Sequence, residues 1–519
     1  MGGLEKIVSV FKALKGKGVS LLGLILTFVF FIASSASEAS KLPEYRLDVI
    51  IDVETSSLTG RAELYFPLSQ ELVLSLSELI IRDISLDNRP VDFANKEVLR
   101  LVVNKGSRLV IHYGAIFKGS NSNIIDDRGI ALRGVWYPHA EGRFIYKLKA
   151  NLPNGYIALS EAERVKKDKH MGKELYDFHF PYPLYDSDGI SLIASKDFVV
   201  NHELFDGIEI YTYLLPTEAH LSKTFIEHTK RYLKRYNRLL GRYPYRRLSI
   251  VEHFDSAGYS LPTYVFLGKE DFKLPIEKTP LGHEIVHQWF GNYVFTDYDH
   301  GNWNEGFTIY FADHLQEELN GMGWKCRRRI LSGFKSHVKR DIDFPLADFT
   351  ERYDLISRSI GYGKSAMVVH MLRRIAGDKA FYRAIRDFVM QNRFRVATWR
   401  DIQRAFEHST KMELGWFFDQ WVYDTGTPEL SLSLVKIQEQ RGRYDIEFSI
   451  NQRETDFRMP VNVSFHTEKG AMRQTFWVER QADRFTVSLN DKPKKMVLDE
   501  DYDLFRICLL YTSPSPRDS

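Results

Sequence analysis

Short runs in which apolar and polar residues alternate dominate the first part of the chain, from about Tyr45 to Tyr213. Residues 45–53 and 61–66 are examples, and turn-forming residues bound each run. Alternation with a period of two places every second side chain on the same face, which is typical of a β-strand with one buried face. We therefore predict an N-terminal antiparallel β domain over residues 41–215.

The spacing of apolar residues changes after Pro216. Residues 219–240 keep apolar positions three to four apart, which is the period of an amphipathic helix. Helical patterns of this kind continue to about Trp421. They predict a mostly helical middle domain over residues 216–427.

Alternating runs return after residues 426–428, which read Gly-Thr-Pro. Examples are residues 430–434, 461–465 and 475–478. They predict a small C-terminal β-sandwich over residues 428–507. The predicted fold class is thus a multidomain α+β protein with a β domain at each end.

The first 36 residues have the layout of a secretory signal peptide. Four lysines precede the apolar run 19–33, and the small-residue stretch 33–37 follows it. We predict cleavage near Ala36. The charge-free stretch 18–37 has 20 residues and is long enough to span a bilayer, so an uncleaved anchor is the alternative. In either case we expect an exported protein, periplasmic or extracellular, with possible membrane attachment through residues 19–36.

The last twelve residues, 508–519, differ in character from the rest of the chain. They resemble the translation of a transposase-type DNA sequencing adapter. A disordered Ser/Pro tail is the alternative for this composition.

Composition narrows the classes of function. The chain has 519 residues, of which 44% are hydrophobic and 27% charged, as in a globular protein. The net charge of +3 comes largely from the leader, so we expect no nucleic-acid partner. With only two cysteines, Cys326 and Cys508, there is no disulfide framework and no cysteine-based zinc site. Any metal must be held by histidines and carboxylates.

One segment of the helical region carries candidate metal chemistry. Thr279 is a plausible N-cap and Pro280 suits the first helical position, so a helix is expected to begin there. His283 and His287 then lie four residues apart on one face and can chelate one ion. Glu284 lies beside them and can reach a water at that ion, as in the His-Glu-x-x-His pattern of zinc peptidases.

A catalytic zinc ion needs three protein ligands and one open position. Glu305 opens the next helical pattern and is the predicted third ligand. Asp297 and Asp299 are weaker alternatives, and His300 is expected to be a loop residue rather than a neighbour of the ligands. Two histidines with one glutamate favour one Zn²⁺ per chain over the metals that prefer oxygen ligands only.

Residues 283–292 together with 304–307, Asn-Glu-Gly-Phe, resemble the gluzincin family of aminopeptidase N and leukotriene hydrolase, here as a bacterial-type exported member. The resemblance covers about residues 45–435. Further similar motifs are Trp-Tyr-Pro at 136–138, Tyr-Pro-Tyr at 243–245, Gly-Tyr-Gly-Lys at 361–364 and Phe-Asp-Gln-Trp at 418–421.

This resemblance implies a thermolysin-like catalytic domain and assigns roles to two more side chains. Glu284 would be the general base that takes a proton from the attacking water. Tyr362 matches the tyrosine of the family's Tyr-x-Lys motif and would donate a hydrogen bond to the oxyanion. Peptides or proteins would then be the substrates.

The sequence departs from the family pattern in two places. Seventeen residues separate His287 from Glu305, where the family has eighteen, and a loop can absorb the difference. The glutamate of the family's Gly-x-Met-Glu-Asn motif, which binds the substrate's α-amino group, is missing, since no carboxylate lies between Asp255 and Glu270. Either Glu252 or Asp255 could substitute for it. The candidate substrate-binding residues at this edge are Ser256, Ala257, Gly258, Tyr259 and Ser260.

The sequence therefore predicts an exported zinc metallopeptidase, aminopeptidase-like in character. Because the amino-group partner is missing, an endopeptidase or another zinc hydrolase, such as an epoxide hydrolase, is the alternative. A catalytically silent protein-binding scaffold is the alternative from another class, although Glu284 and Tyr362 argue against it. The sequence indicates no oligomeric state.

Overall fold

A computed structural model describes residues 40–93, 97–118, 123–185, 189–253, 258–453 and 456–507. The described residues form two compact units, which divide between Phe198 and Val199. The predicted leader and the last twelve residues lie outside the described residues, so the structure says nothing of signal cleavage, anchoring or the tail. Within the described ranges, no helix combines the length and the apolar character that a membrane span needs.

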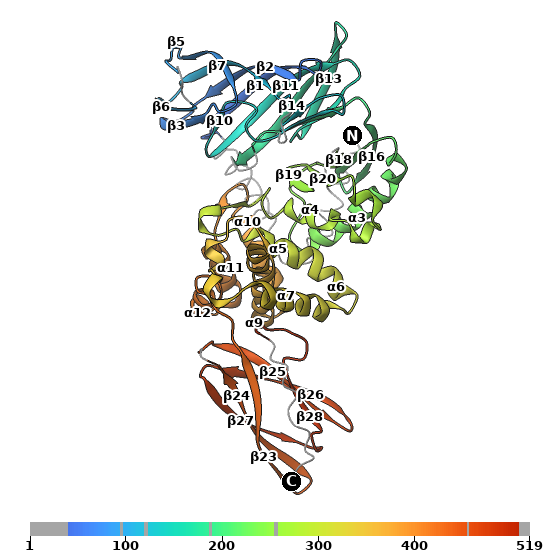
Figure 1. The fold of residues 1–519 in the computed structure, drawn as a ribbon, viewed down its shortest axis with the longest axis vertical. Helices are drawn as coiled ribbons and strands as arrows, with labels where there is room; N and C mark the ends of the chain where they lie inside the picture. The colour runs from blue at the N-terminus through green and yellow to red at the C-terminus, as the bar shows by residue number, and fades with distance from the viewer. Residues whose placement is uncertain are drawn as a thin grey trace, which may run out of the picture. The chain divides into compact units, whose positions relative to one another are not determined.

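The first unit is built from strands, as the alternating sequence pattern predicts (Figure 1). Its main sheet has eight strands in the order β13-β14-β11-β1-β2-β7-β4-β5, and sheets of three strands (β10-β3-β6) and four strands (β12-β15-β9-β8) accompany it. The strands are β1 (Glu44–Asp52), β2 (Ser57–Tyr65), β3 (Gln70–Ser75), β4 (Ile80–Leu86), β5 (Arg89–Pro90), β6 (Val98–Val103), β7 (Arg108–Ile116), β8 (Ile124–Ile125), β9 (Ile130–Leu132), β10 (His139–Ala140), β11 (Arg143–Pro153), β12 (Ile157–Leu159), β13 (Arg164–His170), β14 (Lys173–Tyr185) and β15 (Leu192–Ser195).

Strand β1 shows how sequence and sheet are related. Tyr45, Leu47, Val49 and Ile51 are buried, while the residues between them face solvent. This is the period-two pattern of a sheet with one covered face. The prediction of an antiparallel domain needs one correction, because β1 pairs with β11 in parallel. Alternation specifies which face is buried, but it does not specify strand direction.

The second unit begins with a five-stranded sheet, in the order β16-β17-β18-β20-β19. Its strands are β16 (Val199–Phe205), β17 (Ile208–Leu214), β18 (Arg247–His253), β19 (Tyr259–Leu261) and β20 (Tyr264–Gly268). The unit boundary lies between Phe198 and Val199, earlier than the predicted domain boundary at 215. The reason is that β17 pairs in parallel with β18, which ties β16 and β17 to the helical region.

Helices make up most of the region between this sheet and residue 421 (Figure 1). The α-helices are α3 (Ser222–Leu239), α4 (Leu281–His287), α5 (Asn304–Ile309), α6 (Leu315–Leu319), α7 (Gly323–His337), α8 (Leu355–Arg358), α9 (Ser365–Ala376), α10 (Asp378–Gln391), α11 (Trp399–Thr410) and α12 (Gly415–Trp421). Short 3₁₀ turns are η1 (Ala219–Leu221), η2 (Asp271–Lys273), η3 (Ile276–Lys278), η4 (Tyr298–His300), η6 (Arg340–Ile342) and η7 (Leu346–Asp348), and the two-stranded sheet is β21 (Phe295–Thr296) with β22 (Val396–Ala397).

Two long helices of this region each contain a π-helical turn. One is η5 (Tyr310–His314), which joins α5 to α6, and the other is η8 (Ser359–Lys364), which joins α8 to α9. A π turn inserts one residue into the helix and changes the direction in which later side chains point, and such turns are frequent at functional sites.

The C-terminal part of the second unit is the predicted β-sandwich. One sheet has the order β23-β24-β27 and the other β26-β25-β28. Its strands are β23 (Leu430–Gln440), β24 (Arg443–Gln452), β25 (Met459–Thr467), β26 (Gly470–Val478), β27 (Ala482–Leu489) and β28 (Lys495–Leu498). The ring of Phe448 in the first sheet packs on Phe465 and Phe476 of the second, with centroid distances of 5.7 Å and 5.1 Å.

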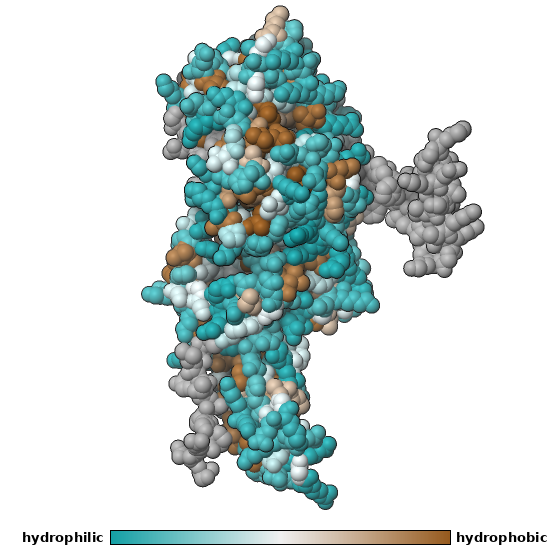
Figure 2. Space-filling view, turned by 90° about the vertical axis from the view of Figure 1, so that its right-hand side faces the viewer, coloured by the Kyte–Doolittle hydropathy of each residue, from teal (hydrophilic) through white to brown (hydrophobic). Residues whose placement is uncertain are grey.

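The observed fold is therefore a β-rich N-terminal region, a helical middle region and C-terminal β sheets, which confirms the predicted multidomain α+β class. On the face drawn in Figure 2, hydrophilic residues predominate and apolar residues form separate groups.

Candidate metal centre

Helix α4 presents the two predicted histidine ligands. It begins at Leu281, one residue after Pro280, and its buried face carries Leu281, Ile285 and Val286. His283 and His287 lie one turn apart on another face, and their Nε2 atoms approach to 3.2 Å. Helical spacing alone thus brings two ligand nitrogens to one point.

Glu305 reaches the same point from helix α5. Its Oε2 lies 3.6 Å from Nε2 of His283 and 3.6 Å from Nε2 of His287. The three side chains are the one group of His, Cys, Asp and Glu, among the residues that the structure describes, whose ligand atoms all lie within 4.8 Å of one another.

Close packing of α5 on α9 holds Glu305 at this place. Gly306 faces Ser365 so closely that an added Cβ would overlap the Ser365 Oγ and Cβ atoms and lie 3.0 Å from its carbonyl carbon. A larger residue at 306 would push the two helices apart. The glycine next to Glu305 is therefore required by the helix contact.

Each histidine has a second partner on its other ring nitrogen. Nδ1 of His283 lies 3.1 Å from Oδ2 of Asp313, in the π turn η5. Nδ1 of His287 lies 3.1 Å from the Phe290 carbonyl oxygen and 3.3 Å from Oγ1 of Thr308. Because a carboxylate and a carbonyl only accept, both Nδ1 atoms carry the proton and both Nε2 atoms keep a lone pair for a metal.

The site fits a cation in its charges as well as in its donor atoms. In the described ranges, no hydrogen-bond donor satisfies the buried Oε2 of Glu305. Burial lowers the pKa of His283, but the hydrogen bond with Asp313 and the nearby carboxylate of Glu305 outweigh it and raise the pKa to about 10. Burial raises the pKa of Glu305, but the charges of His287 and His283 outweigh it and hold the pKa below its ordinary value. Two nitrogens and one oxygen around a point that favours positive charge suit Zn²⁺.

Glu284 lies beside this point and is buried. Burial raises its pKa, although the charges of His287 and His283 act in the opposite direction. A carboxylate with a raised pKa is a better proton acceptor than an exposed one. Gly258 borders it, since a Cβ added to Gly258 would lie 3.7 Å from Oε1 of Glu284.

Tyr362 comes from the second π turn, η8. Its ring packs edge-on against Phe349, with centroids 6.0 Å apart, and an added Cβ on the neighbouring Gly361 would overlap the same Phe349 ring. Burial and then the charge of Glu305 raise the pKa of Tyr362 above its ordinary value. The phenol therefore keeps its proton near neutral pH and remains a hydrogen-bond donor.

The weaker ligand candidates form a separate pair. Nδ1 of His300 lies 3.0 Å from Oδ2 of Asp297, and the side chain of His300 is largely exposed. Asp299 lies in the same 3₁₀ turn, η4. None of the three belongs to the group around His283. The shortened stretch between His287 and Glu305 thus runs through β21 and η4 without disturbing the convergence of the three ligand side chains.

The predicted substrate-binding residues are described only in part. Ser256 and Ala257 lie outside the described residues. Gly258 borders Glu284, and Tyr259 and Ser260 lie on the short strand β19, which pairs antiparallel with β20. The Ser260 hydroxyl accepts hydrogen bonds from the side-chain amides of Gln288 and Asn292, so it helps to hold the strand in place.

Gln288, next to His287, fixes the hairpin of β19 and β20. Its Nε2 donates to Ser260 Oγ at 2.6 Å and to the Leu261 carbonyl at 2.7 Å. Its Oε1 accepts from the Thr263 amide at 3.1 Å and from the Tyr243 hydroxyl at 3.2 Å. Thr263 has a φ of 74°, an uncommon conformation for a β-branched residue, so this amide supports a strained turn.

The two proposed substitutes for the missing glutamate differ in what the structure shows. Glu252 is buried, and its Oε2 accepts a hydrogen bond from the Leu215 amide at 2.8 Å. Glu252 therefore holds the main chain at the residue that directly follows β17. Asp255 lies outside the described residues.

Sequence reasoning missed Asp313, Thr308 and Gln288. Thr308 and Asp313 follow Glu305 by three and eight residues. A regular helix would place residues 305 and 313 on nearby faces, but the π turn between them decides where Asp313 points. The position of Gln288 directly after the histidine motif was the one available signal for it.

A helix with His-Glu-x-x-His whose imidazoles converge with a glutamate from a following helix is the site arrangement of metallopeptidases. Residues 277–421 match the model of a protein family that is described as "Peptidase family M1 domain". This part of the chain is therefore similar to the peptidase M1 domain, and the comparisons with individual proteins point to the same family.

Three relatives illustrate the similarity. Glutamyl aminopeptidase of Sus scrofa is 28% identical over 178 residues, which is 31% of this chain and 18% of the relative. Aminopeptidase N of Lactococcus lactis subsp. lactis is 25% identical over 169 residues, 30% of this chain and 19% of the relative. Aminopeptidase M1 of Arabidopsis thaliana is 22% identical over 322 residues, 58% of this chain and 36% of the relative. The chain thus spans well under half the length of these relatives.

A solved structure shares the fold over most of the chain. The structure of Legionella pneumophila aminopeptidase A, in complex with aspartic acid, aligns with a TM-score of 0.76 and 16% identity. The alignment covers 91% of this chain and 60% of the other. At this identity the likeness supports the fold.

Proposed function

We propose that this protein is a zinc-dependent metallopeptidase that acts on peptides in an aminopeptidase-like manner. The observation that carries the proposal is the convergence of His283, His287 and Glu305, with Glu284 beside them. The match of residues 277–421 to the peptidase M1 domain supports it. His283, His287 and Glu305 would hold one zinc ion, which when bound would polarise the substrate carbonyl and make a water molecule more acidic.

Glu284 moves the proton in this scheme. Its buried carboxylate accepts a proton from the attacking water as the water oxygen bonds to the carbonyl carbon of the scissile peptide. The protonated Glu284 then gives that proton to the amide nitrogen as the C–N bond breaks. The raised pKa of Glu284 suits both steps, because the group must accept and then release a proton near neutral pH.

Tyr362 stabilises the charge that develops during attack. The carbonyl oxygen becomes negative as the tetrahedral species forms, and the phenol donates a hydrogen bond to it. Since the pKa of Tyr362 is raised, the donor is present throughout the neutral range. The contact with Phe349 fixes the ring before substrate arrives.

The mode of cleavage needs a separate test, because no carboxylate in the described range 258–269 could receive a free α-amino group. We propose exopeptidase action from the family relationship, with endopeptidase action as the second candidate. An unpaired ammonium group would be costly to bury in a closed cleft, so blocked or internal peptides would lose less by this absence.

The decisive experiment uses the purified protein loaded with zinc and a peptide mixture with matched free and acetylated N-termini. Mass spectrometry would follow the products, with Glu284→Gln as the control. Loss of single residues from free N-termini only supports the aminopeptidase, and internal cuts support the endopeptidase. If no cleavage depends on Glu284, the peptidase proposal is wrong. Turnover of an epoxide would then support another zinc hydrolase, and protein capture without turnover would support a protein-binding scaffold.

We also propose that the protein acts outside the cytoplasm. The support is the leader-like sequence of residues 1–36. Fractionation of cells that express the tagged full chain would test this, together with N-terminal sequencing of the exported form for cleavage near Ala36.

A further inference from the structure

The chain returns from the last strand, β28, onto the helices of the second unit. We call residues 499–506 the C-terminal clamp. Asp499, Asp503, Leu504, Phe505 and Arg506 are all buried. The clamp thus contacts the helical region by burial of charged as well as apolar side chains, which is uncommon unless each charge has partners.

Phe505 provides the apolar part of this contact. Its ring packs on Phe334 of α7 at 4.7 Å and on Trp421 of α12 at 6.3 Å. The Lys364 ammonium group, at the end of the π turn η8, lies 6.0 Å from the ring centroid. The Phe505 amide points at the sulfur of Met371 in α9, at 3.4 Å. The clamp therefore touches the helix that carries Tyr362.

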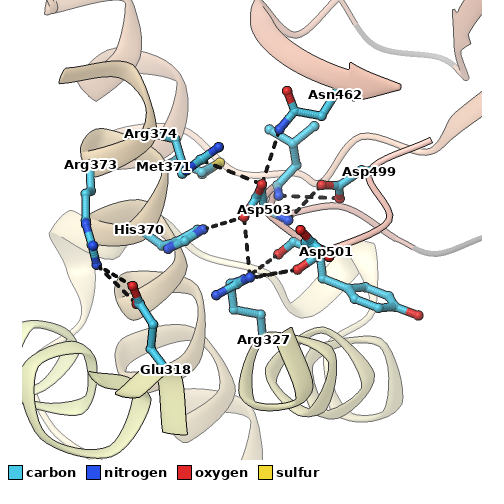
Figure 3. Close-up of polar contacts among 12 residues, drawn as sticks. Glu318, Arg327, His370, Met371, Arg373, Arg374, Asn462, Asp499, Asp501 and Asp503 are labelled. Carbon is cyan, nitrogen blue, oxygen red and sulfur yellow. Dashed lines mark hydrogen bonds and ion pairs between the residues drawn. The ribbon is translucent and has the colours of Figure 1, made fainter. Parts of the chain in front are cut away.

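Arg327 of α7 provides the polar part (Figure 3). Its guanidinium donates to the main-chain oxygens of Asp501 and Tyr502 at 2.9 Å and 3.1 Å. It also lies 3.4 Å from Oδ1 of Asp503 and donates from its other end to Nε2 of His314 at 2.8 Å. One side chain thus joins the clamp to the π turn η5.

His370 of α9 makes the second polar link. Its Nε2 lies 2.9 Å from Oδ1 of Asp503 (Figure 3). Its Nδ1 lies 3.4 Å from the Tyr310 hydroxyl. Arg373, one turn further along α9, donates to the Tyr310 hydroxyl at 3.2 Å and pairs with Glu318 at 3.0 Å. We call this group the polar seam; its members are Tyr310, His314, Glu318, Arg327, His370, Arg373 and Asp503.

The seam lies between the two helices that carry Glu305 and Tyr362. The continuous helix α5-η5-α6 supplies Glu305 and then three seam residues, and the helix α8-η8-α9 supplies Tyr362 and then two. The helices touch first at Gly306 and Ser365, beside the candidate site, and then along the seam. Their separation at the site is thus set by a steric contact at one end and by the seam beyond it.

We propose that the polar seam, completed by the C-terminal clamp, positions Tyr362 relative to Glu305. The proposal rests on the proposed function for its kinetic part. Arg327 and Asp503 are positioning residues, since neither belongs to the group of candidate ligands and both act through the helices. Loss of either would remove one partner of a buried charge and would loosen the contact of the clamp with α7 and α9.

The hydrogen bonds of the seam also define how it responds to acid. An arginine only donates, so Nε2 of His314 accepts and its proton is on Nδ1, 3.5 Å from Oε2 of Glu318. A second proton on His314 would point at the guanidinium of Arg327. His370 donates from Nε2 to Asp503 and can take its second proton only on the side of Tyr310.

The charged and titratable neighbours of the two histidines come from η5, α6, α7, α9 and the C-terminal clamp. His370 is faced by Asp503, Arg327, Arg374, Tyr310 and His314, and His314 by Arg327, Glu318, Arg373, Asp503 and His370. Burial lowers the pKa of His370 to about 4, against a smaller opposing contribution from Asp503, and burial with the charge of His370 lowers that of His314 to about 2. Because both values lie below the ordinary 6.5, the released histidines bind protons more readily than the packed ones, and acid favours release. The seam is intact above pH 6.5 and weakens as the pH falls toward 4.

The test compares Arg327→Met with Arg329→Met in the full chain. Arg329 lies on the same helix, and its exposed side chain pairs with Glu317 outside the seam. The Arg329→Met substitution therefore removes the same charge without affecting the clamp. Hydrogen exchange of the peptide 499–507 is expected to rise at least tenfold in Arg327→Met and to stay unchanged in the control. Unchanged exchange in a folded Arg327→Met protein would overturn the clamp.

Kinetics separate positioning from general destabilisation. We expect kcat, corrected for folded protein, to fall about tenfold in Arg327→Met, with KM within threefold and zinc content unchanged. In a Tyr362→Phe background the same substitution is expected to add little, because the seam acts through Tyr362. Equal losses of kcat in both backgrounds, or no loss, would overturn the positioning role.

A third measurement applies if Arg327→Met does not fold. Exchange of peptide 499–507 in the unaltered chain, divided by the intrinsic exchange rate at each pH, is expected to increase as the pH falls from 6.5 to 4. His370→Gln keeps a donor toward Asp503 but cannot take up a proton there, so it should move this change to lower pH. An exchange profile that is flat above pH 4 would overturn the acid response. If the unaltered protein has no peptidase activity, the proposed function fails, and the exchange experiments still decide whether the clamp exists.

Discussion

The contact between Gly306 and Ser365 yields a prediction with a defined sign. Gly306→Ala in an ordinary helix interior would stabilise the protein by about 1 kcal/mol, because alanine has the higher helix propensity. Here the new Cβ would overlap the Ser365 side chain and lie 3.0 Å from its carbonyl carbon, in a fully buried position. Overpacking of a tight core costs about 1–3 kcal/mol, so the clash outweighs the propensity gain and we expect net destabilisation of up to about 2 kcal/mol.

The same substitution should weaken the metal site. Relief of the overlap requires α5 to move by about 1 Å, and a misplacement of that size can cost about a hundredfold in rate. Glu305 is the residue directly before the glycine, so it moves with the helix. We expect zinc affinity to fall at least tenfold, measured by competition with a chromophoric chelator. Because the second unit is larger than 250 residues, we also expect a melting temperature lower by about 1–2 °C for each kcal/mol lost.

Two further variants make the outcome decisive. Gly333 lies inside helix α7 with no atom within 4 Å of an added Cβ, so Gly333→Ala should stabilise the protein and leave zinc binding unchanged. In the double variant Gly306→Ala with Ser365→Gly the overlapping atoms are absent, so zinc affinity should recover in large part. The reasoning is refuted if Gly306→Ala binds zinc as the unaltered chain does, or if removal of the Ser365 side chain restores nothing.

Three other predictions address single side chains. Glu284→Gln should lower kcat by at least about a hundredfold while zinc still binds with near-normal affinity, since Glu284 is not one of the proposed ligands; equal loss of zinc would contradict its role as base. Asp313→Asn should lower zinc affinity by about 10–100-fold, because the carboxylate that orients His283 is lost; an unchanged affinity in chelator competition would show that the contact is dispensable. Gln288→Met removes the amide that holds the β19–β20 hairpin, so KM should rise more than kcat falls, and a thermal shift without a change in KM would assign Gln288 to stability alone.

Much of the fold could be predicted because burial imposes short periods on the sequence. The strand predicted at 45–53 is β1, and the helix predicted at 219–240 contains α3. Both patterns depend on which residues face the core, and the sequence records this directly. The parallel pairing of β1 with β11 could not be predicted, since the partners are about a hundred residues apart and alternation is the same in either direction.

The placement of strands in compact units was also decided by tertiary pairing. Residues 199–214 alternate like the strands before them, so the sequence pattern groups them with the N-terminal β domain. In the structure β17 pairs with β18, and both belong to the second unit. Local patterning has no means of identifying a partner that follows a helix.

The sequence by itself determined that His283 and His287 face one point with Glu284 beside them, because this arrangement depends only on the residue spacing along a single helix. It also marked Glu305 and Tyr362 through their local motifs. Only the tertiary structure decided that Glu305 reaches the histidines, that Asp313 orients one of them, and that the clamp joins the seam. These contacts connect residues from separate helices or from distant parts of the second unit. Their distances depend on packing and π turns that no local pattern encodes.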